Sequence, residues 1–347
     1  MAIDVTMSSM SLNPIIHDNS VTITWRGENA PCFISDLHGW EQNPQSLTET
    51  QQGVWTISFD LPPNAYLEYA FYDPQAKKRF FDPLNKKSVY NGVGGYNHFF
   101  YMPQAQPTPL TNLPASGLRG KITRHALPAQ YVTVGRERRV SLYHPPTTGE
   151  PVPLLVVYDG PDYLRRGKLA AIVDNLIAAK RIRPLAIAFL QNGGAARMVE
   201  YGQAEPTLSF VIGQVLPLAS RELNLLDFEN QPGAHGVMGA SMGGLMSVFT
   251  ALKAPEVFGK AVSQAGAFEL WERETTTMQM VRHFPKPNVK LWLDCGSMDF
   301  LLASNRKMAA LLAEKRYDFT YRENGGAHNY TTWRDACVEG LERLFGD

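Results

Sequence analysis

A serine between glycines has the spacing of a catalytic nucleophile. Residues Gly239-Ala-Ser-Met-Gly243 fit the pattern G-x-S-x-G, in which the serine occupies a sharp turn between a strand and a helix. The flanks fit as well, with a short strand expected over 236–238 and a helix over 242–252. Ser241 should therefore stand above the sheet instead of bonding within it, at a helix N-terminus that favours negative charge. The alternative is that Ser241 is only a small cap and that the glycines allow close packing.

A serine hydroxyl needs an imidazole to take its proton and a carboxylate to orient that imidazole. In the folds that carry this motif, the acid and then the histidine follow the serine along the chain. His328 lies in a glycine-containing loop before the final expected helix, so we predict it as the general base rather than as a solvated turn residue. Asp299 follows the strand expected over 289–294 and is the predicted acid. Asp294 is the alternative, although it could instead bond amides of the following turn.

Ester cleavage also needs backbone N–H groups that stabilise an oxyanion. The first donor is expected from Met242, directly after the serine, and the second from the loop after an earlier buried strand. That loop reads Asp-Gly-Pro-Asp from residue 159. Proline has no N–H, so the donor is Gly160, Asp162 or, in a wider loop, Tyr163. We favour Gly160.

An open sheet is expected to position these residues. From about Lys121, strands alternate with helices, which is typical of an α/β domain whose mostly parallel sheet carries helices on both faces. The domain is expected to begin with a hairpin of strands 131–134 and 139–143 that turns at Gly135. The other expected strands are 153–158, 185–190, 236–238, 289–294 and 319–322, and the expected helices are 169–180, 208–223, 242–252, 305–316 and 332–344.

The N-terminal part has a different pattern. Five short apolar segments separated by turn residues predict a small all-β, immunoglobulin-like sandwich of five to seven strands, and the segments are 21–25, 31–35, 54–61, 66–72 and 98–102. Residues 103–120 contain four prolines and predict an extended linker. We therefore expect a β-sandwich module over 1–102, this linker, and an α/β catalytic domain over 121–347.

Composition excludes several classes of partner. The 347 residues include 33 basic and 33 acidic side chains, and this balance argues against nucleic acid or an anionic membrane as a partner. Three widely spaced cysteines favour reduced thiols over a disulfide framework or a metal knuckle. The N-terminus lacks a basic segment followed by an apolar run, so we expect no secretory signal and a cytoplasmic protein. Serine-based acyl transfer requires neither a metal nor an organic cofactor.

The motifs resemble those of the esterase family that contains enterochelin esterase-like and esterase D-like α/β-hydrolases. The matching residues are Asp159-Gly160, Gly239-Ala-Ser-Met-Gly-Gly244, Gly296-Ser-Met-Asp299, Gly326-Ala-His328 and Trp333. The resemblance covers nearly the whole α/β domain. It implies that Ser241, Asp299 and His328 form a triad, and that the protein is a serine carboxylesterase that cleaves a small-molecule ester through an acyl-enzyme.

The same resemblance suggests residues around the substrate. Arg197-Met-Val-Glu200-Tyr201 resembles the R-x-x-E-[LY] element of the family, so Arg197 and Glu200, with Asp162, are candidate substrate-binding residues. The alternative is that Arg197 and Glu200 make ion pairs that staple a loop. For an anionic tris-catecholate, further candidates are Arg165, Arg166 and Arg282. A carboxylesterase for short acyl or aryl esters is an equal alternative.

The N-terminal region resembles early-set, glycogen-binding-like modules in Phe33–Trp40, Gly53–Trp55, Leu67–Phe71 and Phe81–Asn85. Trp40 matches one aromatic of a sugar platform, but only Phe80 or Arg79 lies near the second. The module is therefore expected to cover an edge of the active site or to promote a homo-oligomer rather than to bind carbohydrate. Two further alternatives stay open: an acyltransferase that uses the same triad, and a non-catalytic carbohydrate-binding or scaffold protein.

Overall fold

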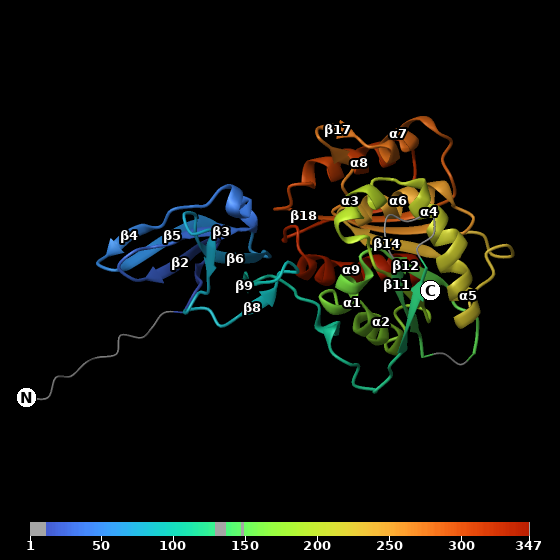
Figure 1. Cartoon of the computed structure of the whole chain (residues 1–347), viewed down its shortest axis with the longest axis horizontal. Coiled ribbons are helices and arrows are strands. Elements are labelled where there is room, and N and C mark those ends of the chain that lie inside the picture. The colour runs from blue at the N-terminus through green and yellow to red at the C-terminus, as the bar shows by residue number, and fades with distance from the viewer. Residues whose placement is uncertain (1–11, 129–136, 147–148, 347) are drawn as a thin grey trace, which may run out of the picture. The chain divides into compact units, whose positions relative to one another are not determined.

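A computed structural model describes residues 12–128, 137–146 and 149–346 (Figure 1). The strand expected over 131–134 and its turn at Gly135 lie outside the described residues. The chain divides into two compact units. The first runs through Gln106 and includes Gly325–Ala327, and the second comprises Pro107–Asn324 and the residues from His328 onward. Each unit is described by itself.

The first unit contains two antiparallel sheets. One has the order β1-β2-β5-β4, with bounds Ile15–His17, Ser20–Arg26, Val54–Asp60 and Thr48–Gln51. The other has the order β3-β6-β9-β8, with β7 paired to β6, and bounds Cys32–Ser35, Tyr66–Asp73, Tyr96–Tyr101, Ser88–Tyr90 and Lys78–Phe80. Over the described residues of this unit, these nine strands exceed the five to seven predicted, because short strands such as the fully exposed β4 show no apolar alternation.

The aromatic side chain that matched a sugar platform, Trp40, is half-buried and contacts charged side chains within this unit. The guanidinium of Arg79 lies 4.9 Å from the centre of the Trp40 ring and also pairs with Glu41. The indole Nε1 of Trp40 donates to Asp36 at 3.2 Å. Stacking against sugars requires an open ring face, so these contacts favour a structural role for Trp40.

The second unit is built on a mixed sheet of eight strands in the order β10-β11-β13-β12-β14-β15-β18-β19. Their bounds are Lys121–Leu127, Arg138–His144, Ala186–Leu190, Leu154–Val157, Gly236–Ala240, Lys260–Gln264, Lys290–Gly296 and Asp318–Asn324. The strands from β13 to β19 run parallel, and β10 and β11 are antiparallel at one edge. This confirms the predicted α/β-hydrolase architecture, although β10 and β15 were missed. The hairpin partner of β11 is β10 and not the strand expected over 131–134.

Helices follow the parallel strands. Their bounds are Gly160–Arg165 (α1), Leu169–Ala178 (α2), Arg197–Tyr201 (α3), Glu205–Phe210 (α4), Leu216–Glu222 (α5), Met242–Lys253 (α6), Thr276–His283 (α7), Leu302–Glu314 (α8) and Tyr330–Phe345 (α9). A two-stranded hairpin of β16 (Glu269–Leu270) and β17 (Arg273–Glu274) precedes α7. Among the described residues, no helix has the length and apolar character needed to cross a membrane.

The helix predicted over 208–223 is divided. A π-helical turn at Val211–Val215 separates α4 from α5, and Pro217 lies in the first turn of α5. Because proline lacks an N–H and its ring crowds the preceding turn, a regular α-helix cannot continue unchanged through this position.

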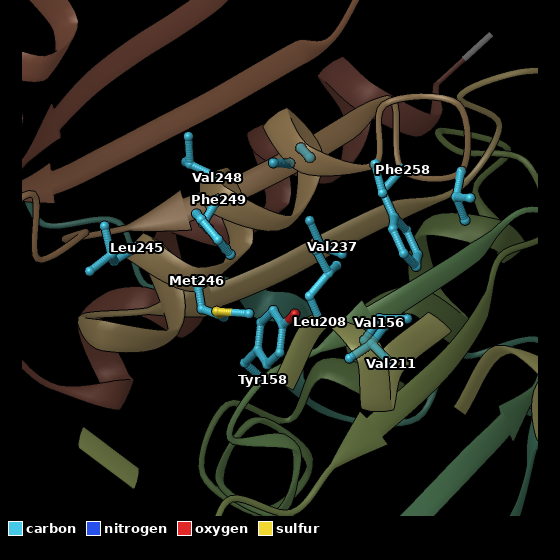
Figure 2. Close-up of a cluster of buried hydrophobic side chains, with 14 of the residues drawn as sticks. Val156, Tyr158, Leu208, Val211, Val237, Leu245, Met246, Val248, Phe249 and Phe258 are labelled. Carbon is cyan, nitrogen blue, oxygen red and sulfur yellow. The ribbon is translucent and has the colours of Figure 1, made fainter. Parts of the chain in front are cut away.

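Two apolar clusters hold the helices against the sheet. One joins α4, the π-helical turn and α6 to the strands, and Figure 2 shows Met246 and Phe249 of α6 in this cluster with Val156 and Val237 of the sheet. The other joins α2 and α9 to the same strands. Both faces of the parallel strands are therefore buried, which explains their continuous apolar sequences.

Part of the expected linker is anchored to the second unit. The side-chain amide of Asn175 in α2 donates to the carbonyl groups of Leu110 and Asn112, at 3.1 and 2.7 Å. The N–H of Gly120 donates to Asp174 at 2.8 Å. Residues from Pro107 onward therefore pack as part of this unit, in spite of a composition that predicts an extended spacer.

Candidate active site

Ser241 lies at the tight turn between β14 and α6. Its backbone has φ 57° and ψ −123°, a conformation that residues other than glycine rarely adopt. The turn also needs small neighbours, because a Cβ on Gly239 would lie 2.4 Å from the carbonyl group of Gly243. The N–H of Ser241 still donates to Gln264 of β15 at 2.9 Å, so the backbone remains bonded to the sheet, contrary to the prediction. Its carbonyl accepts the N–H of Leu245 in α6 at 3.0 Å, so the chain turns from the sheet into the helix at this residue.

His328 and Asp299 are in direct contact. Nδ1 of His328 lies 2.8 Å from Oδ2 of Asp299, whose other oxygen accepts the N–H of Leu301 at 2.8 Å. The Asp299 carboxylate is fully buried, whereas the histidine side chain is 23% exposed. A carboxylate can only accept, so Nδ1 carries the proton and Nε2 keeps a free lone pair. This is the tautomer that a general base requires.

Two aromatic rings fix the orientation of the imidazole. Trp333 meets the His328 ring edge to face, with ring centres 5.0 Å apart. Phe300, the residue after Asp299, lies on the ring at 4.5 Å and is itself 77% exposed. One side of the imidazole therefore packs against the buried indole of Trp333, and another side contacts the exposed phenyl ring of Phe300.

Ser241, Asp299 and His328 follow β14, β18 and β19. Because these strands are parallel, their carboxyl ends lie at the same edge of the sheet. Gln264 joins Ser241 to α9, since its carbonyl accepts from Ser241 and its side-chain amide donates to the carbonyl of Trp333 at 2.9 Å. Within the described part of the chain, Ser241 Oγ makes no hydrogen bond, to His328 or to any other residue. The hydrogen bond between the serine nucleophile and the histidine base is often long in unliganded hydrolases.

Asp294 occupies the core instead of the site edge. Its carboxylate accepts from Trp292 Nε1 at 3.0 Å and from Gln264 Nε2 at 3.1 and 3.3 Å. The expectation that it bonds turn amides is thus wrong, and side chains take their place. Burial raises the pKa of Asp294 to about 7, against the hydrogen bonds from Trp292 and Gln264, which lower it. The geometry favours Asp299 as the acid.

The raised pKa of Asp294 predicts a pH-dependent stability. In the unfolded chain the carboxyl ionises near its ordinary value of 3.8, whereas in the folded protein it stays protonated to about pH 7. The folded state therefore binds the extra proton between these values, and this group lowers the free energy of unfolding as pH rises. The loss is on the order of 4 kcal/mol over this whole pH range. Asp294→Asn should remove it.

Urea denaturation at pH 5 and pH 8 measures this difference. The stability of Asp294→Asn relative to wild type should increase from pH 5 to pH 8, because only the wild type must ionise the buried group. A relative stability that does not change with pH would show that Asp294 ionises as it does in water.

The loop after β12 provides the second candidate oxyanion donor. Asp159 adopts a left-handed conformation, with φ 53°, and α1 begins at Gly160. The N–H groups of Asp162 and Tyr163 both donate to the carbonyl of Asp159, at 3.0 and 3.3 Å. Those two donors are therefore occupied, and Gly160 is the donor that the geometry favours. Met242 likewise begins α6, where first-turn N–H groups have no partner inside the helix.

Gly160 cannot accept a side chain without rearrangement. A Cβ at this position would lie 2.4 Å from the backbone of both Phe189 and Leu190 in β13. We expect Gly160→Ala to lower stability by about 1 to 3 kcal/mol and to lower kcat, because the loop must move away from β13. Thermal denaturation and ester hydrolysis measure the two effects. Gly213→Ala is a matched control, since a Cβ there meets nothing within 4 Å. Equal behaviour of the two variants would contradict the prediction.

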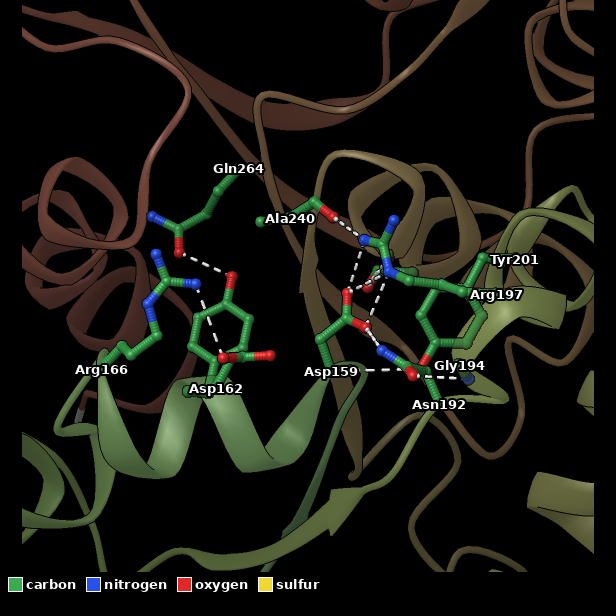
Figure 3. Close-up of polar contacts among 12 residues, drawn as sticks. Asp159, Asp162, Arg166, Asn192, Gly194, Arg197, Tyr201, Ala240 and Gln264 are labelled. Atoms are coloured by element: carbon green, nitrogen blue, oxygen red, sulfur yellow. Dashed lines mark hydrogen bonds and ion pairs between the residues drawn. The ribbon is translucent and has the colours of Figure 1, made fainter. Parts of the chain in front are cut away.

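The charged residues expected around the substrate are paired within the protein, and Figure 3 shows the pairs of Arg197 with Asp159 and of Arg166 with Asp162. Arg197 binds the carboxylate of Asp159 and Glu200 forms an ion pair with Arg138 of β11, while Asp162 lies 3.5 Å from Arg166 one turn further along α1. These contacts favour the loop-stapling alternative for Arg197 and Glu200.

The other arginines considered for an anionic substrate also make contacts within the protein. Arg166 stacks on the Tyr330 ring at 4.5 Å, and Arg282 pairs with Glu274 at 2.6 Å. Arg165 is exposed and donates to a backbone carbonyl of its own helix. Across the described ranges, no group of three or more His, Cys, Asp and Glu side chains could hold a metal ion.

Sequence reasoning missed three contributors to this region. Gln264 ends the unpredicted strand β15, Asn192 binds the Asp159 carboxylate, and Phe300 lies on the imidazole. The only sequence signal was for Phe300, which directly follows the predicted acid. Gln264 and Asn192 acquire their partners through long-range contacts that no local pattern encodes.

The chain is similar to known esterases. Residues 132–344 match the family described as "Putative esterase". Iron(III) salmochelin esterase of Escherichia coli O6:H1 is 26% identical over 286 residues, which is 76% of this chain and 67% of that protein. Iron(III) enterobactin esterase of Dickeya dadantii is 25% identical over 228 residues, 60% of this chain and 52% of that protein. The alignments thus span about half to two thirds of these relatives.

A solved structure shows that the fold is shared over both units. The crystal structure of ferric enterobactin esterase from Salmonella typhimurium superimposes with a TM-score of 0.82, at 19% identity, and covers 97% of each chain. The family match itself spans well over half of the sequence. The chain therefore belongs to this esterase family and is an ester hydrolase.

Proposed function

We propose that the protein is an enterochelin esterase-like serine carboxylesterase that uses Ser241, His328 and Asp299 as its triad. The contact between His328 Nδ1 and the buried Asp299 carboxylate carries this proposal, because it leaves Nε2 as a base at the sheet edge where Ser241 lies. The strained backbone of Ser241 supports it, since such strain is typical of a nucleophile at this turn.

The proposed reaction is acyl transfer to water. Ser241 Oγ attacks the ester carbonyl while Nε2 of His328 takes the hydroxyl proton, and Asp299 stabilises the imidazolium that forms. Backbone N–H groups of Met242 and Gly160 bind the oxyanion. The imidazolium then protonates the leaving alcohol, and water activated by His328 releases the acyl group from Ser241.

A small-molecule ester is the proposed substrate. The named relatives act, by their names, on iron(III) salmochelin and iron(III) enterobactin, and we propose an ester of that kind for this chain. A substrate panel should contain iron(III) enterobactin and p-nitrophenyl esters of short acyl and aryl acids. Higher kcat/KM for the siderophore supports this assignment, whereas higher kcat/KM for the simple esters replaces it with a general carboxylesterase.

A fluorophosphonate probe with mass mapping tests the mechanism. We expect a single adduct on Ser241 and loss of ester hydrolysis in proportion to labelling. Label elsewhere, or hydrolysis by the fully labelled protein, would contradict Ser241 as the nucleophile, whereas the absence of both label and hydrolysis would favour a non-catalytic scaffold. Addition of acceptor alcohols during turnover distinguishes the acyltransferase alternative, because a transferase would give new esters in place of free acid.

We further propose that the protein is cytoplasmic and forms a homo-oligomer through its N-terminal module. The three cysteines support a reducing compartment, since all are free and both Cys295 and Cys337 are buried. Fractionation of expressing cells tests the location. Light scattering of the full chain and of a chain that lacks the module tests the assembly.

A further inference from the structure

We infer that Arg197 is a positioning residue, which together with Asp159 fixes the distance between the two backbone segments that form the oxyanion hole. The inference rests on the proposed function and deepens it. It assigns a role to a charged pair that lies close to the nucleophile and that the triad chemistry does not use.

Asp159 is held on every polar atom that it presents (Figure 3). Arg197 Nε donates to its two oxygens at 2.8 and 3.1 Å, and Nη2 adds a bond of 2.6 Å. Asn192 donates to Oδ1, and the backbone N–H of Asp159 donates to the hydroxyl of Tyr201 at 3.1 Å. These contacts stabilise the left-handed backbone of Asp159, and that backbone directs the N–H of the next residue, Gly160.

The pair also reaches the segment that carries the nucleophile. Nη2 of Arg197 lies 3.5 Å from the carbonyl of Ala240, the residue before Ser241. On the other side, a Cβ on Gly243 would lie 3.3 Å from Oδ2 of Asp159, so the carboxylate lies against the first turn of α6. The ion pair is therefore located between the Gly160 loop and the start of α6, where Met242 is the other donor.

Asp159 stabilises the charge of the Arg197 guanidinium. The Asp159 side chain is 2% exposed, so its carboxylate depends on the guanidinium for stabilisation. Burial by itself lowers the pKa of Arg197, but the hydrogen bonds to Asp159 and its charge outweigh burial and raise that pKa. A fork that binds both oxygens fixes position as well as charge, which a single ammonium contact does not.

A second buried ion pair in the same unit provides a matched control. Arg138 of β11 pairs with Glu200 of α3, and their side chains are only 7% and 6% exposed. Removal of Arg138 leaves a buried carboxylate without its cation, as removal of Arg197 does. The difference is that the carboxylate of Glu200 does not belong to the oxyanion loop.

The experiment compares Arg197→Met with Arg138→Met in the full chain. For Arg197→Met we expect kcat to fall about 10 to 100-fold with KM within about threefold, because displaced donors stabilise the transition state less than the bound ester. The rate of fluorophosphonate labelling should fall similarly. For Arg138→Met we expect an equal or larger loss of Tm, with kcat within about threefold. This crossed pattern cannot come from a structural role shared by both pairs.

Two outcomes would overturn the inference. One is that kcat falls in step with Tm in both variants, and the other is that Arg197→Met keeps wild-type kcat. If Arg197→Met does not fold, Arg197→Lys replaces it, since it keeps the charge but loses the fork. It should lower kcat about fivefold or more with little change in Tm, and unchanged kcat would overturn the inference. Failure of the wild type to label at Ser241 would refute the proposed function instead.

Discussion

Ser241→Ala is expected to lower kcat by about 10⁶-fold with KM nearly unchanged, because it removes the only atom that forms the covalent bond to the acyl group. The substitution deletes a partly exposed hydroxyl that makes no hydrogen bond in the described part of the chain. Folding should therefore be unaffected. Steady-state hydrolysis of p-nitrophenyl esters and thermal denaturation measure the two quantities.

His328→Ala provides the internal control for this result. The loss of kcat in His328→Ala should be similar to that in Ser241→Ala. The double variant should lose no more kcat than either single variant, since nucleophile and base act as one unit. Residual hydrolysis should remain above that of water because the oxyanion donors are intact. Additive losses in the double variant, or a Ser241→Ala enzyme with measurable burst kinetics, would contradict the assigned nucleophile.

Asp299→Asn is expected to lower kcat by about 10⁴-fold. The amide would keep the shape of the buried group, but its nitrogen would be able to donate to Nδ1 and select the tautomer in which Nε2 carries the proton. A histidine in that tautomer cannot accept from Ser241. Hydrolysis rates across pH 5–9 provide the measurement, and the loss should shrink at high pH as hydroxide replaces the base.

Asp294→Asn is the matched control for that experiment. Asp294 is five residues earlier and equally buried, yet it contacts Trp292 and Gln264 and not the imidazole. Its kcat should stay within about threefold of wild type, because the loss of one neutral core contact costs little in rate. A reversal of the two results, with Asp294→Asn inactive and Asp299→Asn active, would exchange their assignments.

Strands of the second unit were predicted from the sequence where their residues are continuously apolar. The run from Pro153 to Tyr158 is continuous and apolar and became β12, as expected for a strand with both faces buried. Strand β15 was missed because it reads Lys-Ala-Val-Ser-Gln, and two of its polar residues, Ser263 and Gln264, are completely buried. Burial of polar side chains there follows from partners elsewhere in the fold, which local pattern cannot supply.

In the candidate site too, local pattern predicted some residues, and contacts between distant residues decided the others. Asp299 and His328 were predicted from chain order and loop position, and the structure brings them within hydrogen-bond distance. The assignment of Arg197 remained open, because its partner Asp159 is 38 residues away and turns a charge at the site into an internal ion pair. Motif resemblance identified the residue but could not distinguish substrate contact from a bond within the protein.

The backbone angle at Ser241 has a consequence for the choice of nucleophile. A positive φ crowds branched side chains at Cβ, so threonine, which bears the same hydroxyl, would add steric strain at this position. Cysteine has no such branch and would fit. The conformation that exposes the hydroxyl therefore restricts evolutionary exchange at position 241 to an unbranched oxygen or sulfur nucleophile, and excludes the threonine chemistry that other hydrolase folds use.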